Sequence, residues 1–318
     1  MNLYKINKNK LIPIESLDFS LEKNIQNLVE ANTRELFSLE FVSSEFSISE
    51  FRLDSLCFDE ESNSFVIVEY KKGSSYSVID QGYSYLSTML NNKADFILEY
   101  NENMPSSIKK NDIDWSASRV IFISPSFNSY QKNSVNFKDV PFELWEIQGF
   151  NGDLISLEQH RSTSKESIEK FAKNNQIISN VSSEVTVYRE EDVIAKSNAS
   201  IKLLWDELKE RLTNLSNVEF VPNSNSSYIK FTKHGKGVCY FNFKKQYIKG
   251  EIIRGNIYPD GKKSKNFFVI DDPKNICKEY NFTYKSGIEG HRYIFEIKNK
   301  SNLDYLEMLI KQKYNQVF

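Results

Sequence analysis

The chain has 318 residues, which suits two domains better than one hydrophobic core. Hydrophobic residues make up 40% and charged residues 26%, and no apolar run approaches the roughly 18 residues of a membrane span, so a cytoplasmic protein with no membrane partner is expected. The three cysteines and three histidines form no CxxC, HxxxH or HxH pair. Neither a disulfide framework nor a zinc or histidine-built metal site is therefore expected.

Strand-like and helical patterns mix along the first half of the chain. After a short lead-in of residues 1–19, helical spacing begins at Leu21, with Ser20 as its N-cap. In chain order, the elements expected next are strands at 41–48, 51–58 and 65–70, a helix at 76–90, strands at 94–100 and 119–124, a short helix at 126–136, and a strand at 142–150. Strands joined by crossover helices predict an α/β fold, a mixed sheet flanked by helices.

The second half follows a polar segment. Residues 162–198 are rich in Ser, Asn, Lys and Glu, with a polar helix candidate at 165–175, and this composition is typical of an inter-domain linker. Helical spacing then resumes at Ile201. The later expected elements are strands at 218–221, 227–232, 238–243, 247–254, 267–270 and 292–297 and a helix at 302–316. The sequence therefore predicts one domain at 1–161 and a smaller α+β domain at 199–318.

Charge is unevenly distributed, although the net charge is only −2. Between Tyr228 and Lys265 there are ten Lys and Arg but only two Asp and Glu, interleaved with aromatic residues. Cations alternating with aromatic rings can track a phosphate backbone and stack bases, so Lys244 and Lys245 are candidate DNA contacts. The alternative is a half-buried sheet, with the aromatics in the core and the lysines on its wet face.

Two neighbouring expected strands carry the residues with the clearest chemistry. Glu69 and Lys71 are two apart at the end of one strand, so they share a face. Asp54 lies 15 residues before Glu69, a spacing that suits a hairpin with the carboxylates side by side. Such a pair repels unless a cation lies between its members, and hard oxygen ligands suit Mg²⁺ or Mn²⁺. We therefore predict Asp54 and Glu69 as metal ligands.

Lys71 would orient or deprotonate the attacking water, or neutralise a phosphate. The alternative is a strand end with solvated charges and an ordinary ion pair. The otherwise apolar run Phe65–Val68 argues against it, because a solvated face is not expected on such a strand.

The stretch from Leu21 to Tyr100 resembles the PD-(D/E)XK nuclease superfamily, in particular its NucS-like branch. In that branch a helix with an early Glu precedes a strand with an Asp, a strand ending in E-x-K, and a helix opening with Q-x-x-x-Y. The corresponding residues here are Glu22, Asp54, Glu69, Lys71, Gln81 and Tyr85. The resemblance covers about 130 residues. It implies a restriction-endonuclease-like fold and Mg²⁺-dependent (or Mn²⁺-dependent) hydrolysis of DNA. The C-terminal half resembles a small domain of unknown function that follows such nuclease domains in some bacterial proteins.

Further residues receive roles around this set. Glu22 is expected to complete the metal shell, with Glu30 as its rival, and the alternative for either is a solvated helix face. Glu45 on the preceding strand could support the ligands from behind.

The helix after the E-x-K strand offers two more side chains. Gln81 and Tyr85 lie one turn apart and can both face the site, where Gln81 would hold Lys71 or a phosphate and Tyr85 would pack or contact DNA. Helix packing is the alternative for both. Arg52 and Lys72 are candidate phosphate contacts.

Three hypotheses follow for function. The first is a metal-dependent deoxyribonuclease in DNA repair, restriction or defence, working as a homodimer as the superfamily often does. The second is a binding protein on an inactive nuclease fold, against which the intact Asp54, Glu69 and Lys71 set argues. The third is a partner-binding module whose C-terminal domain carries the function. Fold alone does not separate them.

Overall fold

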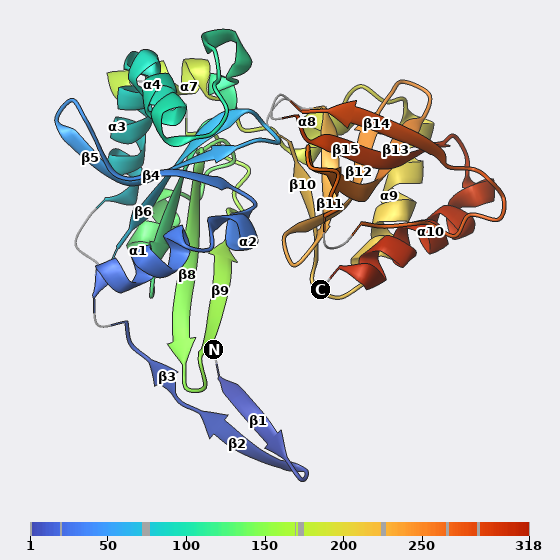
Figure 1. Ribbon diagram of the computed structural model, residues 1–318, viewed down its shortest axis with the longest axis horizontal. Coiled ribbons are helices and arrows are strands. Elements are labelled where there is room, and N and C mark those ends of the chain that lie inside the picture. The colour runs from blue at the N-terminus through green and yellow to red at the C-terminus, as the bar shows by residue number, and fades with distance from the viewer. Residues whose placement is uncertain are drawn as a thin grey trace. The chain divides into compact units, whose positions relative to one another are not determined.

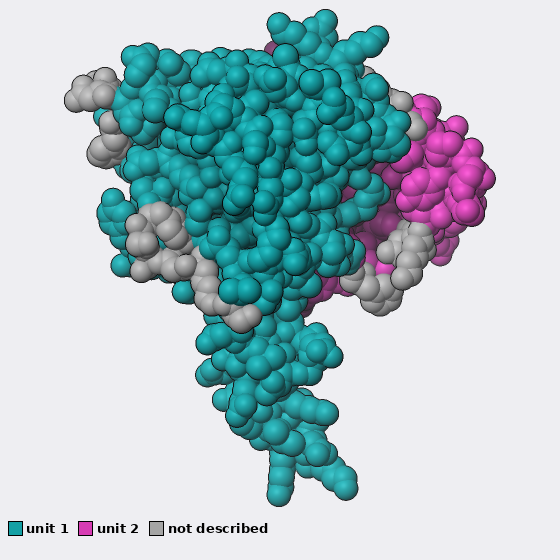
Figure 2. Space-filling view, turned by 60° about the vertical axis from the view of Figure 1, so that its left-hand side comes forward, with its two compact units in different colours: residues 1–187 teal, residues 188–318 magenta. Residues whose placement is uncertain are grey.

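The computed structural model describes residues 2–19, 21–71, 77–168, 170, 175–223, 227–264, 267–284 and 287–317. It divides into two compact units, residues 1–187 and 188–318 (Figures 1 and 2). The predicted combination of a mixed α/β sheet flanked by helices with a smaller α+β unit is confirmed. Two sequence predictions, Ser20 as an N-cap and Lys72 as a phosphate contact, lie outside the described residues.

The first unit is built on a seven-stranded sheet of order β3-β8-β7-β6-β5-β4, with β9 paired to β8. Its strands are β3 (Ser16–Leu17), β4 (Glu40–Ile48), β5 (Phe51–Asp59), β6 (Ser64–Tyr70), β7 (Arg119–Ser124), β8 (Phe142–Phe150) and β9 (Leu154–His160). The pairs β6–β7 and β7–β8 are parallel and the others antiparallel. Parallel neighbours need crossover connections, and helices supply both of them.

Helices cover the two faces of this sheet. They are α1 (Glu22–Glu30), α2 (Thr33–Phe37), α3 (Val78–Asn91), α4 (Lys93–Asn103), α5 (Ser129–Ser134) and α7 (Gln176–Glu184), with short 3₁₀ turns at Lys110–Asp112 and Trp115–Ala117. Side chains of α1 and α2 pack on one face, whereas those of α3, α4 and α7 pack on the other. Strand β6 is buried along its whole length because it lies between both layers (Figure 1).

Residues 94–100 are helical in α4, so the strand expected there is wrong. The apolar residues Ala94, Phe96, Leu98 and Tyr100 alternate, but Phe96 and Tyr100 are also four apart and are the ones buried in the core. Leu98 is 56% exposed, as expected where a helix turns it outward. A spacing of four residues fits both the two-residue period of a strand and the 3.6-residue period of a helix, and tertiary packing decides between the two structures.

The segments expected to be a lead-in and a linker hold further elements. The lead-in holds a hairpin, β1 (Leu3–Asn7) with β2 (Lys10–Ile14), and then β3. The expected linker 162–198 holds α7, which packs against α3, and α8 (Glu190–Ile194). Val181 and Val185 are buried in the first unit's core, so that unit continues to residue 187. Within 165–175, the polar helix candidate, residues 169 and 171–174 lie outside the described residues.

The second unit is a six-stranded antiparallel sheet of order β10-β11-β12-β13-β15-β14. Its strands are β10 (Val218–Pro222), β11 (Tyr228–Lys233), β12 (Lys236–Phe243), β13 (Ile248–Ile257), β14 (Lys278–Thr283) and β15 (Glu289–Ile297). Helices α9 (Ala199–Thr213) and α10 (Leu303–Gln316), the latter entered through a 3₁₀ turn at Lys300–Asn302, pack on one face around the buried Trp205. The strand expected at 267–270 does not form, because Phe268 fills the core from an irregular segment instead.

Within the described ranges, no helix combines the length and apolar character that crossing a membrane requires.

Candidate active site

Asp54 and Glu69 lie side by side on β5 and β6. The antiparallel register pairs Ser55 with Val68, which sets Asp54 beside Glu69 on the face covered by α3. The backbone N–H of Tyr70 donates to Asp54 Oδ2 at 3.0 Å and fixes that carboxylate. Glu69 is only 3% exposed, whereas Asp54 is half-buried. The hairpin expected from the sequence spacing therefore forms and brings the two acids together.

Three donors converge on one oxygen of Glu69. Lys71 Nζ donates to Glu69 Oε1 at 2.6 Å, Gln81 Nε2 at 2.8 Å and the Tyr85 hydroxyl at 3.1 Å. Gln81 also donates to the Tyr85 hydroxyl at 2.7 Å, and both come from α3. Helix α3 therefore presents the i, i+4 pair to the acid, so that Gln81 contacts Glu69 rather than Lys71 in the contacts recorded. Lys71 itself is anchored by its N–H, which donates to the Ile123 carbonyl at 2.8 Å.

The second oxygen of Glu69 lies in an unfavourable environment for a negative charge. Glu69 Oε2 is buried and accepts no hydrogen bond from the described residues. Burial, followed by the charge of Asp54, raises the pKa of Glu69 to about 7, and burial also raises the pKa of Asp54. Two close carboxylates of this kind favour a shared proton or a bound cation. Lys71 alone does not offset the cost of burying the Oε2 charge, since it contacts the other oxygen, Oε1.

Asp54 and Glu69 fit a small divalent cation on these grounds. Both side chains offer hard carboxylate oxygens as metal ligands, and one of these oxygens, Glu69 Oε2, is buried and accepts no hydrogen bond from the described residues. Among the described residues no group of three His, Cys, Asp or Glu converges as a metal site. The protein offers two carboxylates at this position, Asp54 and Glu69.

The two acids of α1 lie on the other side of the sheet. Glu22 is exposed at the first position of α1, away from the acid pair on the opposite face of the sheet. Glu30 Oε1 accepts hydrogen bonds from Gln26 at 2.8 Å, Ser44 at 2.8 Å and Ser55 at 2.6 Å. The hydroxyls of Ser55 and Tyr70 are 3.1 Å apart, so this network lies behind the strands that carry Asp54 and Glu69.

Gln26 is a residue that the sequence reasoning missed. It is 6% exposed, and its Nε2 donates to the main-chain oxygen of Asp54 at 3.0 Å. Gln26 lies one helical turn after Glu22 and one before Glu30, so its spacing could have revealed it. It links α1 to the strand position that bears the first acid.

Glu45 and Arg52 form a surface ion pair at the β4–β5 hairpin. Glu45 accepts from Lys23 at 2.8 Å and lies 3.3 Å from Arg52. The hydrogen bond from Lys23, then the charge of Arg52, lowers the pKa of Glu45. Both partners are largely exposed, so Arg52 is held by Glu45 while remaining accessible to solvent.

The basic stretch of the second unit separates into core and surface. Phe231, Phe241 and Phe243 are buried, which the half-buried-sheet alternative predicted. Lys244 and Lys245 are exposed in the turn between β12 and β13. Other cations of the stretch are held by neighbouring acids, as in the Lys249–Glu251 pair at 2.8 Å.

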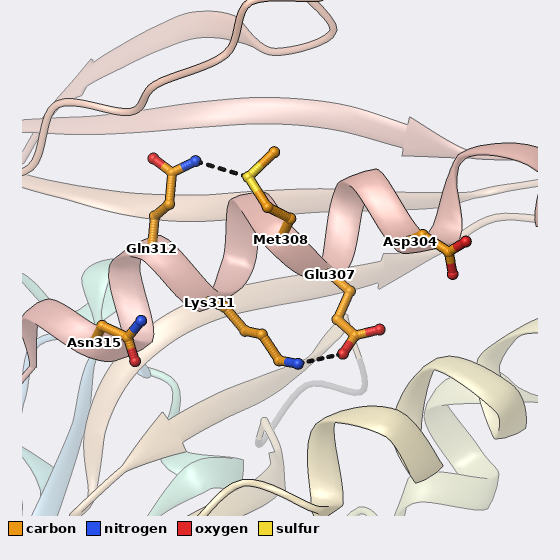
Figure 3. Close-up of a pocket in the computed structure, with 6 residues that line it drawn as sticks. All are labelled: Asp304, Glu307, Met308, Lys311, Gln312 and Asn315. Atoms are coloured by element: carbon orange, nitrogen blue, oxygen red, sulfur yellow. Dashed lines mark hydrogen bonds and ion pairs between the residues drawn. The ribbon is translucent and has the colours of Figure 1, made fainter.

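A surface depression follows the outer side of α10 (Figure 3). Lys311 pairs with Glu307 at 2.5 Å, and Gln312 Nε2 donates to Met308 Sδ at 3.2 Å. These partners are on the same helix, one turn apart, and Gln312 also exchanges hydrogen bonds with the main chain of Asp271. The depression therefore has the character of a solvated helix face, in contrast to the acid pair between β5 and β6.

The fold and site define an α/β protein in which a buried glutamate, a half-buried aspartate and a lysine meet at the end of the central strand. The chain belongs to the same family as an uncharacterized protein of Haemophilus influenzae, which is 38% identical over 314 residues, covering 98% of this chain and 99% of that protein. No family model matches the chain.

Two solved structures are similar to part of the chain. One, the EndoMS-dsDNA2 complex, is 18% identical over 42% of this chain and 47% of that chain, with a TM-score of 0.26. The other, a repair endonuclease from Pyrococcus abyssi, is 20% identical over 37% and 43% of the two chains, with a TM-score of 0.21. The match spans less than half of either structure. At these TM-scores the likenesses add nothing to what the side chains of the site indicate.

Proposed function

We propose that the protein is a metal-dependent deoxyribonuclease of the cytoplasm, acting in DNA repair, restriction or defence, with its active site at Asp54, Glu69 and Lys71. The observation that carries this proposal is the buried Glu69 close to the half-buried Asp54: one Glu69 oxygen, Oε2, accepts no hydrogen bond, while a lysine contacts the other. This arrangement does not stabilise the fold, because two neighbouring like charges and a buried oxygen without a hydrogen bond both cost free energy. A role in binding or catalysis explains it better. DNA as substrate rests on the resemblance to PD-(D/E)XK nucleases in the sequence.

The metal ion, Mg²⁺ or Mn²⁺, would be held by Asp54 and Glu69. When bound, it would lower the pKa of a water and offset negative charge on the phosphodiester. Glu22 is retained as a candidate third acid, although it is exposed and lies on the opposite face of the sheet.

The chain's own groups have distinct tasks. Lys71, 16% exposed in its side chain, would place a positive charge beside the scissile phosphate and orient the attacking water. Gln81 and Tyr85 hold Glu69 Oε1, which would leave Oε2 to bind the ion. The N–H of Tyr70 orients Asp54 in the same way. Glu30 and Gln26 would fix the strands from behind, and Arg52, Lys72, Lys244 and Lys245 are proposed phosphate contacts.

Cleavage of labelled linear, circular, single-stranded and branched DNA tests this proposal. We expect cutting with Mg²⁺ or Mn²⁺, none with EDTA, and cutting at least about 100-fold slower by Lys71→Ala. The matched control is Glu143→Gln on β8, which changes a half-exposed acid that Arg119 Nε contacts at 2.8 Å on the same sheet. That variant should still cut wherever it remains folded.

The competing function is a nucleic-acid- or protein-binding module on an inactive nuclease fold. It would be supported by the absence of cutting on every substrate together with no heat of Mg²⁺ or Mn²⁺ binding in calorimetry. Cutting by Lys71→Ala at the wild-type rate would instead place the activity elsewhere in the chain or in a contaminant. A homodimer, which the resemblance implies, would bring two such sites together on two strands.

A further inference from the structure

In the described part of the second unit, helices cover one face of the sheet. Helices α9 and α10 pack against the strand residues that point to that face, such as Phe231 and Phe241. Because side chains alternate along a strand, their neighbours in the sequence point to the opposite face. Among the described residues, the side chains of this opposite face, the open face, belong to none of the hydrophobic core clusters.

Aromatic rings gather on the open face over strands β11 to β14. The rings of Tyr228 and Tyr240 meet edge to face, with their centres 4.9 Å apart. Those of Tyr280 and Phe282 stack with their centres 6.0 Å apart. Tyr280 is 43% exposed, and the other three are half-buried. These rings add nothing to the core of the unit, so their concentration on one face indicates contact with another molecule.

Arg292 on β15 joins the two pairs of rings. It lies opposite Tyr280 in the register, and its guanidinium carbon is 4.8 Å from the ring centre of Tyr240 and 5.0 Å from that of Phe282. Arg292 is only 7% exposed, and among the described residues its close contacts are with aromatic side chains. A buried cation without a paired carboxylate favours an anion beside it, because an uncompensated buried charge costs free energy.

Three lysines border the rings on the same face. Lys230 on β11 lies opposite Tyr240. The ammonium of Lys249 on β13 is 5.1 Å from the ring centre of Tyr280. Lys278 is exposed on β14, the edge strand that also carries Tyr280. Cations therefore lie within reach of both pairs of rings.

The charge balance of the second unit favours an anionic partner. The acids of the open face are Glu219, Glu251 and Glu296. Glu251 pairs with Lys249 at 2.8 Å, and Glu296 pairs with Lys298 at 2.6 Å. The unit as a whole, residues 188–318, holds 23 Lys and Arg against 16 Asp and Glu, although the net charge of the chain is −2. The unit is therefore basic, and an anionic partner complements it.

Rings and cations together indicate an unpaired nucleic-acid strand. The bases of a single strand can stack on aromatic side chains while its phosphates lie beside cations. A duplex keeps the faces of its bases inside the double helix, so the rings of the open face would have no role in binding it. Strands β11 to β14 span about 19 Å at the roughly 4.8 Å spacing of neighbouring strands, which gives room for several nucleotides.

We propose that the open face binds single-stranded DNA. Bases stack on Tyr280 and Phe282 of the edge strand and on the Tyr240 ring. Phosphates lie beside Lys230 and Lys278, and Arg292 adds its charge from beneath the rings. The choice of DNA rests on the proposed function, whereas the binding needs neither a metal ion nor the residues of the active site.

Fluorescence anisotropy of labelled oligothymidine, titrated with the full chain in EDTA, tests the proposal without cleavage. We expect the single strand to bind at least about 10-fold more tightly than a duplex of the same length. Tyr280→Ala and Phe282→Ala should each raise Kd by about 5- to 100-fold with unchanged circular dichroism, because each removes a stacking surface. Lys278→Ala should reduce the slope of log Kd against log salt concentration by about 0.7, the value for one phosphate contact.

The matched controls lie on the helices of the opposite face. Leu203→Ala, at a side chain 67% exposed on α9, and Lys311→Ala on α10 should leave Kd and its salt dependence unchanged. A single strand that binds no more tightly than the duplex overturns the proposal, and so do ring variants with the Kd of the wild type. Tighter binding of oligouridine or of polyglutamate would overturn single-stranded DNA as the partner. Binding of oligothymidine by a chain that cuts no substrate would support this inference while contradicting the deoxyribonuclease proposal, so the two fail separately.

Discussion

Replacing Glu69 by Gln should stabilise the metal-free protein. Glutamine keeps an oxygen for Lys71, Gln81 and Tyr85, while its amide takes the position of the buried oxygen that accepts no hydrogen bond. It also removes the negative charge next to Asp54, whose repulsion is one cause of the raised pKa of Glu69. If Glu69 were only the acid of an ordinary ion pair with Lys71, the same change would destabilise the protein.

The magnitude follows from the pKa of Glu69, which folding raises from 4.5 to about 7. Between these pH values the folded state holds a proton that the unfolded state has lost, so the free energy of unfolding falls as pH rises through this window. The loss reaches about 3 kcal/mol above the upper limit. Glu69→Gln does not titrate and so does not suffer this loss. We expect its free energy of unfolding to exceed that of the wild type by about 1–3 kcal/mol at slightly alkaline pH, or roughly 3–10 °C in Tm.

Differential scanning calorimetry in EDTA measures this difference. Glu143→Gln serves as the comparison, because it removes an acid that Arg119 contacts at 2.8 Å and should lower Tm. Adding Mg²⁺ should raise Tm of the wild type but not of Glu69→Gln, since the variant loses a metal ligand. A Glu69→Gln protein that melts below the wild type at alkaline pH in EDTA would refute the reasoning.

Three further outcomes are expected. Lys71→Ala should lower the rate of DNA cleavage by about 100-fold or more in a gel assay while circular dichroism stays unchanged, and equal rates would remove Lys71 from the mechanism. Tyr85→Phe, which takes one donor from Glu69 Oε1, should lower the same rate by about 10-fold without abolishing Mg²⁺ binding in calorimetry. Burial, then the charge of Arg292, lowers the pKa of Lys313 from 10.5 to about 8. Between these pH values the unfolded state holds a proton that the folded state has lost, so the free energy of unfolding, measured in urea, should rise with pH in the wild type and less so in Lys313→Met. Parallel pH profiles of the two proteins would contradict this.

Strand periodicity and spacing predicted the elements around the site correctly. The apolar run ending in Glu69 favoured a central strand, and the 15 residues back to Asp54 suited a hairpin; both elements form. Gln81 and Tyr85 were placed by their helical spacing, although their common contact, Glu69 rather than Lys71, depends on how α3 lies across β6. That crossing is set by core packing, which a single sequence does not display.

Other parts depended on contacts between segments far apart in the chain. Local pattern could not decide Phe96 and Tyr100, since a spacing of four fits strand and helix alike. The polar composition before residue 187 concealed Val181 and Val185, whose burial depends on α3 about a hundred residues earlier. Gln26 was missed and Glu30 stayed open for a different reason: polar residues on a helix are usually solvated, and the serines of β4 and β5 that hydrogen-bond to them lie elsewhere in the chain.

The packing of α7 against α3 bears on where the first unit can be cut. A fragment ending at residue 161 would contain every strand of the first sheet and the whole acid pair. It would lack the cover that Val181 and Val185 give to the core side of α3, and the ion pair of Lys93 with Glu184 at 2.6 Å. Such a fragment should expose apolar surface and aggregate, whereas one ending at Val187 should be recovered without aggregation.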